Sequence, residues 1–294
     1  MRPPDLSVIV SIYNRAEAFE RGLWSWCRQD IPHDRFEIVV VDDGSTDGLR
    51  AMLLAHRARL RIQLVTYDRS RHDVYREINA GRDGQPPVFY HTPAVAHNLG
   101  ARCARARVFF ITQPEIIQAE SNARLAIEWA APDRVVFGDA FMTDQIAARR
   151  IAAEWESIRQ RPTCSILGIG GADSSKEPGS LGHWYLAAVH RDTFEEIGGV
   201  DEEYMRGCYA EDDDFRERCK LVGAPVKHVP EIWGIHQDHS DKEPHRDRSS
   251  AHWEAGTAAN RRRFLDFKAS PHARANRERT WGALHQIVNH EVLD

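Results

Sequence analysis

Apolar residues along the chain form short continuous runs that alternate with segments of helical periodicity. Residues 6–12 and 36–41 are apolar runs, and between them Phe19, Leu23 and Trp26 recur at the spacing of one helix face. Further runs at 61–65, 108–112 and 135–137 are interleaved with helical segments at 47–59 and 93–106. Strands joined through helices become parallel by right-handed crossovers. The pattern predicts an α/β sandwich with helices on both faces of a mostly parallel sheet.

Three stretches interrupt this alternation, and the pattern changes after residue 250. We expect loops over residues 67–90, 168–182 and 237–250, because these stretches contain residues that interrupt regular structure, such as Gly and Pro, or lack apolar periodicity. Beyond them, two groups of apolar residues predict two amphipathic helices: Trp253, Ala258, Phe264 and Leu265, then Trp281, Leu284, Ile287 and Val288. We therefore expect one domain over residues 1–240, followed over 241–294 by a mobile loop and a helical C-terminal extension.

Composition narrows the class of protein. The chain has 294 residues, 42% of them hydrophobic, and no apolar run approaches the ~20 residues that span a bilayer. We expect a cytoplasmic protein without a transmembrane segment. The net charge of −5 argues against general nucleic-acid binding, but residues 261–279 contain seven basic and two acidic side chains. That stretch is either a solvated helix surface or a contact for a polyanionic acceptor, a membrane surface or nucleic acid.

Polar side chains follow the first two expected strands, where open parallel sheets bind their ligands. The first strand ends in Ser11, Tyr13, Asn14 and Arg15, and the second in residues 42–47, which include Asp43. An ionised Asp at this edge accepts hydrogen bonds from a base N–H or from ribose hydroxyls. The alternative for residues 42–47 is ordinary turn chemistry, with Ser45 or Thr46 starting the next helix.

Four successive acids, residues 211–214, open a later helical segment. Clustered carboxylates at a helix start can deprotonate a hydroxyl or hold a cation. The alternative is helix capping, with Phe215, Cys219 and Val222 facing the core. Four acids exceed what a cap needs, which favours a catalytic cluster.

Residues 7–14 followed by 39–47 resemble the nucleotide-binding half of family 2 glycosyltransferases, which have the Rossmann-like GT-A fold. Residues 96–100 resemble the family's Ala-Arg-Asn-x-Gly helix, with His97 in the Arg position beside Asn98, where side chains approach the donor diphosphate. Residues 183–214 are similar to the acceptor half of galactosyltransferase-like members. The resemblance covers residues 5–240.

The resemblance implies an inverting transfer of a sugar from a nucleoside diphosphate donor, with UDP as the expected nucleotide, to a hydroxyl of a glycan or other acceptor. By position, Asp212 is the base that deprotonates the acceptor, with Glu211 and Asp213 as neighbours that bind the acceptor or tune the base. Trp184 and Tyr185 would form an aromatic platform for the acceptor, or pack in the core.

The metal site is where the chain departs from the family pattern. In place of Asp-x-Asp after the fourth strand stand Gln113, Pro114 and Glu115. Mn²⁺ or Mg²⁺ would have Glu115 and the late His236 as ligands, with His239 as the spare candidate. Gln113 could instead bond the ribose or phosphate of the donor directly.

Three other functions are compatible with the same sequence features. A nucleotide-sugar-binding module that has lost catalysis would explain the missing Asp-x-Asp. A metal-dependent nucleotidyl- or phosphoryl-transfer enzyme would also place clustered acids on an α/β sheet. A glycosyltransferase with a modified nucleic-acid base as acceptor would use the basic stretch 261–279.

Overall fold

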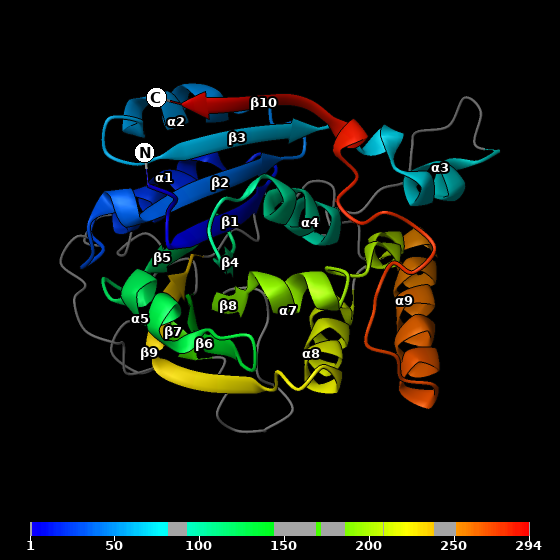
Figure 1. The fold of residues 1–294 in the computed structure, drawn as a ribbon. Coiled ribbons are helices and arrows are strands. Elements are labelled where there is room, and N and C mark those ends of the chain that lie inside the picture. The colour runs from blue at the N-terminus through cyan, green and yellow to red at the C-terminus, as the bar shows by residue number, and fades with distance from the viewer. Residues whose placement is uncertain are drawn as a thin grey trace.

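The computed structural model describes residues 2–81, 93–143, 169–171, 186–207, 209–237 and 251–293. In these residues one mixed sheet runs in the order β10-β3-β2-β1-β4-β8-β6-β9-β5, with β7 beside β6 (Figure 1). The strands are β1 (Leu6–Ile12), β2 (Phe36–Asp42), β3 (Ile62–Tyr67), β4 (Val108–Thr112), β5 (Ile116–Gln118), β6 (Val135–Thr143), β7 (Ile169–Gly171), β8 (Leu186–His190), β9 (Val226–His236) and β10 (Ile287–Leu293). The α-helices are α1 (Ala16–Trp26), α2 (Leu49–His56), α3 (Asp73–Asn79), α4 (Pro93–Cys103), α5 (Asn122–Trp129), α7 (Arg191–Glu196), α8 (Glu211–Leu221) and α9 (Ala251–Ala269).

The four strands β3, β2, β1 and β4 form the parallel centre of the sheet. Because successive side chains of a strand point to opposite faces, their apolar runs supply two cores. Val8 and Val10 of β1 face α1, α2 and α5, whereas Ile9 faces α4, α7 and α8. Helices thus cover both faces, and the predicted α/β sandwich is confirmed.

The second half of the sheet mixes strand directions. Strand β8 pairs antiparallel with both β4 and β6, and β5 pairs antiparallel with β9. Only β6 and β9 are parallel neighbours there. This half leads through α7 and a short 3-10 helix, η4 (Glu202–Arg206), to α8, whose first residues are the four acids.

Two expectations for irregular or helical segments were wrong. The stretch expected as a loop from residue 67 contains the 3-10 helix η2 (Arg69–Arg71) and α3. The second C-terminal helix does not form: residues 284–286 are a 3-10 turn, and residues 287–293 are β10, antiparallel to β3. Without β10 the apolar strand β3 would present an unpaired edge, so pairing outweighs the apparent helical spacing.

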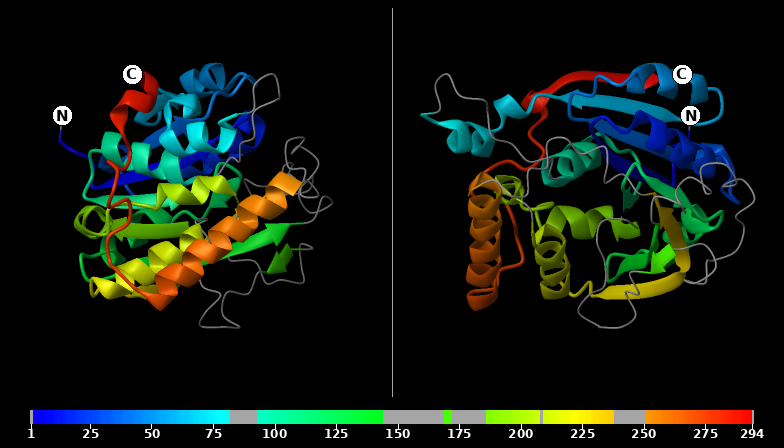
Figure 2. Two further views of the ribbon diagram at one scale, coloured as in Figure 1. Left: turned by 90° about the vertical axis from the view of Figure 1, so that its right-hand side faces the viewer. Right: turned by 180° about the vertical axis from the view of Figure 1, so that it is seen from behind.

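The first C-terminal helix, α9, forms as expected and lies beside α8 (Figures 1 and 2). Its Gly256 packs directly on Gly207: a Cβ built on Gly207 would lie 2.2 Å from the Gly256 backbone. Asn260 donates to the Tyr204 carbonyl at 2.8 Å. These contacts fix the segment that precedes the acids.

Candidate active site

The carboxyl ends of β1 and β2 lie side by side, because Ile12 is in register with Asp42. The two segments that follow are joined by hydrogen bonds. The Asn14 N–H donates to the Ser45 hydroxyl at 2.9 Å, and Thr46 N–H donates to the Asn14 side-chain oxygen at 2.8 Å. Asn14 takes a positive φ of 50°, which Asn tolerates better than most residues. The predicted turn hydrogen bonds are therefore present, and they join the ends of β1 and β2.

The helix start expected at Ser45 or Thr46 is displaced. Helix α2 begins at Leu49, after Gly48 in the left-handed region at φ 85°. Asp47 instead accepts a hydrogen bond from Ala16 N–H at 2.8 Å, the first residue of α1. Ser11, Tyr13, Asn14 and Arg15 are all partly exposed at this edge, as a ligand contact requires.

Asp43 is the centre of a buried polar cluster at this edge. Its carboxylate pairs with Arg69 at 2.8 Å, and the Arg69 guanidinium lies 5.6 Å from the centre of the Tyr13 ring. The Tyr67 hydroxyl also bonds Asp43, and burial first, then the Asp43 charge, raises the pKa of Tyr67 well above its usual value. The Asp43 carboxyl group thus lies between the Arg69 guanidinium and the Tyr67 hydroxyl.

Arg69 was missed by the sequence analysis, which placed it in an irregular loop. It is the second residue after β3, the strand parallel to β2, so it emerges at the edge where Asp43 lies. Position after a parallel strand was the signal that could have found it.

Glu115 and His236 are brought together although they are far apart in sequence. Ile116 of β5 is in register with His236 of β9, and His236 Nε2 lies 3.2 Å from a Glu115 carboxylate oxygen. Gln237 bonds the Glu115 carbonyl through its N–H and its side chain, at 3.1 and 3.0 Å. Gln113 lies partly exposed just before them.

One carboxylate and one imidazole make a partial site for a hard cation, which takes further oxygens from phosphate and water. Among residues 2–81, 93–143, 186–207, 209–237 and 253–293, no group of three or more His, Cys, Asp and Glu side chains gathers as a metal site. The pair therefore fits a hard cation only as two of its ligands, the others being oxygens that are not side chains of this pair. His239, the spare candidate, lies outside the described residues.

The four acids divide between two environments. Glu211, Asp212 and Asp213 are partly exposed in the first turn of α8, and Asp213 pairs with Arg216. Asp214 points inward, 1% exposed, and binds Arg218 through both oxygens at 2.6 and 2.9 Å. Burial raises the pKa of Asp214 to about 6, outweighing the lowering by Arg218. Asp214 is therefore structural, and three acids remain for chemistry.

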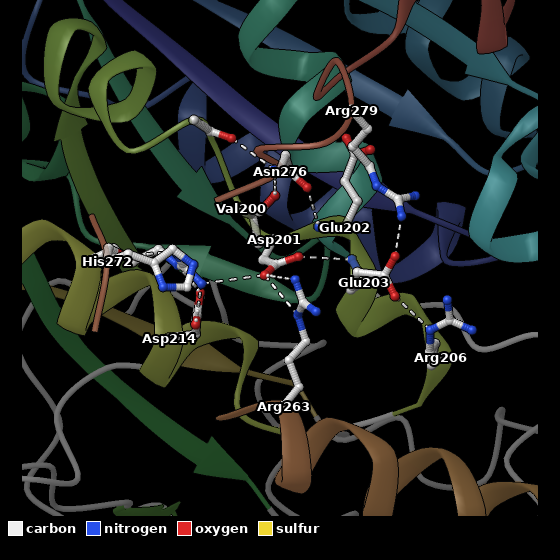
Figure 3. Close-up of polar contacts among 12 residues, drawn as sticks. Val200, Asp201, Glu202, Glu203, Arg206, Asp214, Arg263, His272, Asn276 and Arg279 are labelled. Carbon is white, nitrogen blue, oxygen red and sulfur yellow. Dashed lines mark hydrogen bonds and ion pairs between the residues drawn. The ribbon is translucent and has the colours of Figure 1, made fainter. Parts of the chain in front are cut away.

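The inward pair belongs to a larger network that ties α8 to α9 (Figure 3). Arg218 also approaches Asp201 at 3.5 Å, and Arg263 of α9 binds the same Asp201 oxygen at 2.6 Å. Nearby, Arg279 and Arg206 both pair with Glu203. The backbone before the acids is strained as well as anchored, because Tyr209 and Ala210 take φ of 116° and 69°.

His97 and Asn98 lie in the interior of α4, both 0% exposed. Burial lowers the pKa of His97 to about 3, so its imidazole is neutral. Asn98 donates to the Val200 carbonyl and to Glu202, and accepts from Val200 N–H, each at 2.8 Å. Asn98 thus holds the 200–202 segment on α4, which differs from its expected position at the donor diphosphate. His97, expected at the same place, is buried and neutral and so offers no charge to a phosphate.

Two other expectations meet different outcomes. Trp184 and Tyr185, expected to contact the acceptor, lie outside the described residues. In the basic stretch 261–279, Arg263 and Arg279 are paired with Asp201 and Glu203, while Arg262 and Lys268 pair with Asp266 and Glu217. Arg262 and Lys268 are 79% and 52% exposed, so a nucleic-acid or membrane contact by this stretch stays a prediction. No described helix is long and apolar enough to cross a bilayer.

Comparison with known proteins agrees with the predicted resemblance. Residues 7–81 match the model of the family "Glycosyl transferase family 2". The chain is 28% identical over 262 residues to validoxylamine A glucosyltransferase of Streptomyces hygroscopicus subsp. jinggangensis, covering 80% of this chain and 56% of that protein. The protein of that name from S. hygroscopicus subsp. limoneus is also 28% identical, with 52% of its length covered. The chain thus spans about half the length of these relatives.

Solved structures share the fold. The mannosyltransferase PcManGT from Pyrobaculum calidifontis, in complex with GDP-Man and Mn²⁺, matches with a TM-score of 0.54 and 22% identity, over 89% of this chain and 65% of that one. S. aureus TarS 1–349 matches with a TM-score of 0.52 and 16% identity, over 91% and 75% of the two chains. The match over residues 7–81 and the two relatives support a family 2 glycosyltransferase, and the solved structures confirm the predicted GT-A fold.

Proposed function

We propose that the chain transfers a sugar, with inversion, from a nucleoside diphosphate donor to an acceptor hydroxyl. The observation that carries this proposal is the cluster of Asp43, Arg69 and Tyr13 at the carboxyl ends of β1, β2 and β3. It falls within residues 7–81, the part that matches the family. UDP is the expected nucleotide. Glucose is the first sugar to test, since both curated relatives are named glucosyltransferases.

Each member of the cluster has a function that its chemistry allows. Asp43, acceptor-only when ionised, takes hydrogen bonds from a base N–H or from the ribose. The Arg69 cation pairs with Asp43, and the Tyr13 ring offers an aromatic face to the base. Ser11, Asn14, Arg15 and Gln113 supply polar groups around this edge.

Asp212 is the general base. Asp214 is committed to Arg218 inside the protein and Asp213 to Arg216, which favours Asp212 among the acids. Asp212 takes the proton of the acceptor hydroxyl as that oxygen bonds to the anomeric carbon. The bond from that carbon to the donor diphosphate breaks, and the nucleoside diphosphate leaves with the electron pair. Glu211 and Asp213 orient the acceptor.

Glu115 and His236 would hold Mn²⁺ or Mg²⁺, as their 3.2 Å approach suits a shared cation. When bound, the metal supplies positive charge that stabilises the leaving diphosphate. Glu115 and His236 would hold that charge, and Gln113 precedes Glu115 by two residues in the chain. Trp184 and Tyr185 remain the proposed acceptor platform.

Equilibrium binding of UDP, GDP, CMP and dTDP, with and without Mn²⁺, tests the donor site. UDP should bind more tightly with Mn²⁺, and Arg69→Met should weaken it because Asp43 loses its partner. A chain that binds none of the four nucleotides in either condition has no donor site, and the proposal fails. Binding without any turnover of a UDP sugar would instead favour the module that has lost catalysis.

A further inference from the structure

A cavity of about 620 Å³ lies between η2, the start of α3 and the segment that precedes β10. Its wall includes residues 71–73, Arg102 of α4, Glu202, and residues 278–280 and 282–286. None of them belongs to the proposed donor, base or metal residues. The volume is within the range of about 300–1,000 Å³ that small-molecule sites occupy.

The polar wall carries three arginines and three acids, and two of the arginines also pair with acids outside it, Arg71 with Asp68 at 3.5 Å and Arg279 with Glu203. Three guanidinium groups, those of Arg71, Arg102 and Arg279, line the cavity. Arg102 donates to the Trp281 carbonyl at 3.3 Å and lies 4.0 Å from that ring, but neither partner carries a charge. Within the described residues, no carboxylate pairs with Arg102.

The three acids of the wall are bound by other groups or face solvent. Glu202 is 1% exposed and accepts hydrogen bonds from Asn98 and from Gly282 N–H, at 2.8 and 2.7 Å. Its other oxygen bonds His72 Nε2 at 2.9 Å. Asp73 pairs with Arg76 on its own helix, and Glu278 is exposed to solvent.

His72 is a neutral donor in this arrangement. Val74 N–H donates to His72 Nδ1 at 3.2 Å, so that nitrogen carries no proton. Nε2 therefore holds the proton and donates it to Glu202. The carboxylate is satisfied by three donors without using any of the three arginines.

Two buried polar atoms on the wall have no hydrogen-bond partner in the described residues. One is Nη1 of Arg279, whose Nη2 binds Glu203 (Figure 3). The other is the side-chain oxygen of Gln286, a residue 3% exposed. Hydrogen bonds from Gln286 N–H to the Ala283 carbonyl and from Asp68 N–H to the Gln286 carbonyl fix its backbone. A buried polar group without a partner is costly, which favours a ligand that supplies one.

We propose that this cavity binds a small phosphate-bearing molecule with a hydroxylated body, of the class of sugar phosphates. Arg71, Arg102 and Arg279 bind the phosphate, because guanidinium groups match its oxygens in pairs. The Gln286 amide bonds a hydroxyl of the body. The site is separate from the proposed donor site, and its occupancy does not depend on turnover.

Calorimetric titration of the full chain with glucose 6-phosphate, in saturating UDP to fill the donor site, tests this assignment. Glucose 6-phosphate should bind at one per chain, inorganic phosphate more weakly, and glucose not at all. Arg71→Ala and Gln286→Leu should each weaken binding by about tenfold or more, the effect of losing one charged or buried hydrogen bond. Arg124→Ala, which removes an exposed arginine of α5, is the control and should bind like the natural chain.

Thermal unfolding of each variant separates loss of binding from loss of folding. Gln286→Leu is the more secure variant, since replacing an unpartnered amide by an apolar group of similar size should not destabilise the chain. The proposal is overturned if neither glucose 6-phosphate nor phosphate binds at millimolar concentration. It is also overturned if folded Gln286→Leu binds as tightly as the natural chain.

Discussion

Removal of Arg218 should destabilise the protein more than removal of any exposed arginine. Its side chain is 2% exposed and bonds both oxygens of Asp214, one oxygen of Asp201 and the His272 carbonyl. Its guanidinium carbon also lies 4.5 Å from the Phe267 ring of α9. Arg218→Met keeps the apolar stem but leaves Asp214 without its cation.

Breaking a buried ion pair by removing one partner costs about 3–5 kcal/mol, because the other charge stays desolvated. Asp201 keeps Arg263, so the cost falls mainly on Asp214. We expect the free energy of unfolding of Arg218→Met to fall within that range. Arg124→Met, whose side chain is 40% exposed beside Asp30 and Glu128, should lose only about 0–1 kcal/mol.

Urea unfolding followed by circular dichroism measures both variants against the natural chain. The double variant Arg218→Met/Asp214→Leu removes the buried charge along with its partner, and should be more stable than Arg218→Met alone. A loss for Arg218→Met no larger than that for Arg124→Met would refute the account of this network. So would a double variant less stable than the single one.

Three further predictions concern the other groups. Burial raises the pKa of Asp214 to about 6, above its unfolded value near 3.8, so protonation of this carboxyl stabilises the folded state. This contribution is full below pH 3.8 and is lost as pH rises through 6. In urea titrations, the free energy of unfolding of the natural chain relative to Asp214→Asn should therefore increase as pH falls from 6.5 to 4.5, and a constant difference would contradict this. Asp43→Asn should weaken UDP binding by about tenfold, the effect of one charged hydrogen bond, in calorimetry; unchanged affinity would remove Asp43 from the donor site. Glu115→Gln should raise the Mn²⁺ concentration needed for half-maximal donor turnover, whereas an unaltered Mn²⁺ dependence would separate Glu115 from the metal.

The strands of the first half could be predicted because each is a continuous apolar run buried on both faces. Residues 6–12 and 36–41 therefore gave their strands almost to the residue. Strand β10 could not be found in this way, since Val288 and Val292 are about half exposed and the strand exists to pair with β3. Its partner lies more than two hundred positions away, and no local pattern records that.

The site residues also differ in whether local sequence or distant contacts determine their positions. Asp43 was proposed from its position at a strand end, and Glu115 and His236, proposed as metal ligands, lie 3.2 Å apart at the ends of neighbouring strands. That these residues bind the donor and a metal stays a prediction. The acids looked like one cluster, although Asp214 and Arg218 are four residues apart on one helix face and could have been recognised as an inward pair. The interior position of Asn98 depends on the distant Val200, which sequence spacing does not reveal.

Donor turnover by Asp212→Asn tests the central claim most directly. Release of UDP from UDP-glucose, with Mn²⁺ and water as the acceptor, would be followed for the natural chain, for Asp212→Asn and for Asp192→Asn, which removes an exposed acid of α7 and is the control. Loss of a general base lowers a rate by about 10²–10⁴-fold, so Asp212→Asn should fall by at least the lower figure with UDP affinity unchanged, and Asp192→Asn should turn over like the natural chain. Equal turnover by Asp212→Asn and the natural chain would contradict the account.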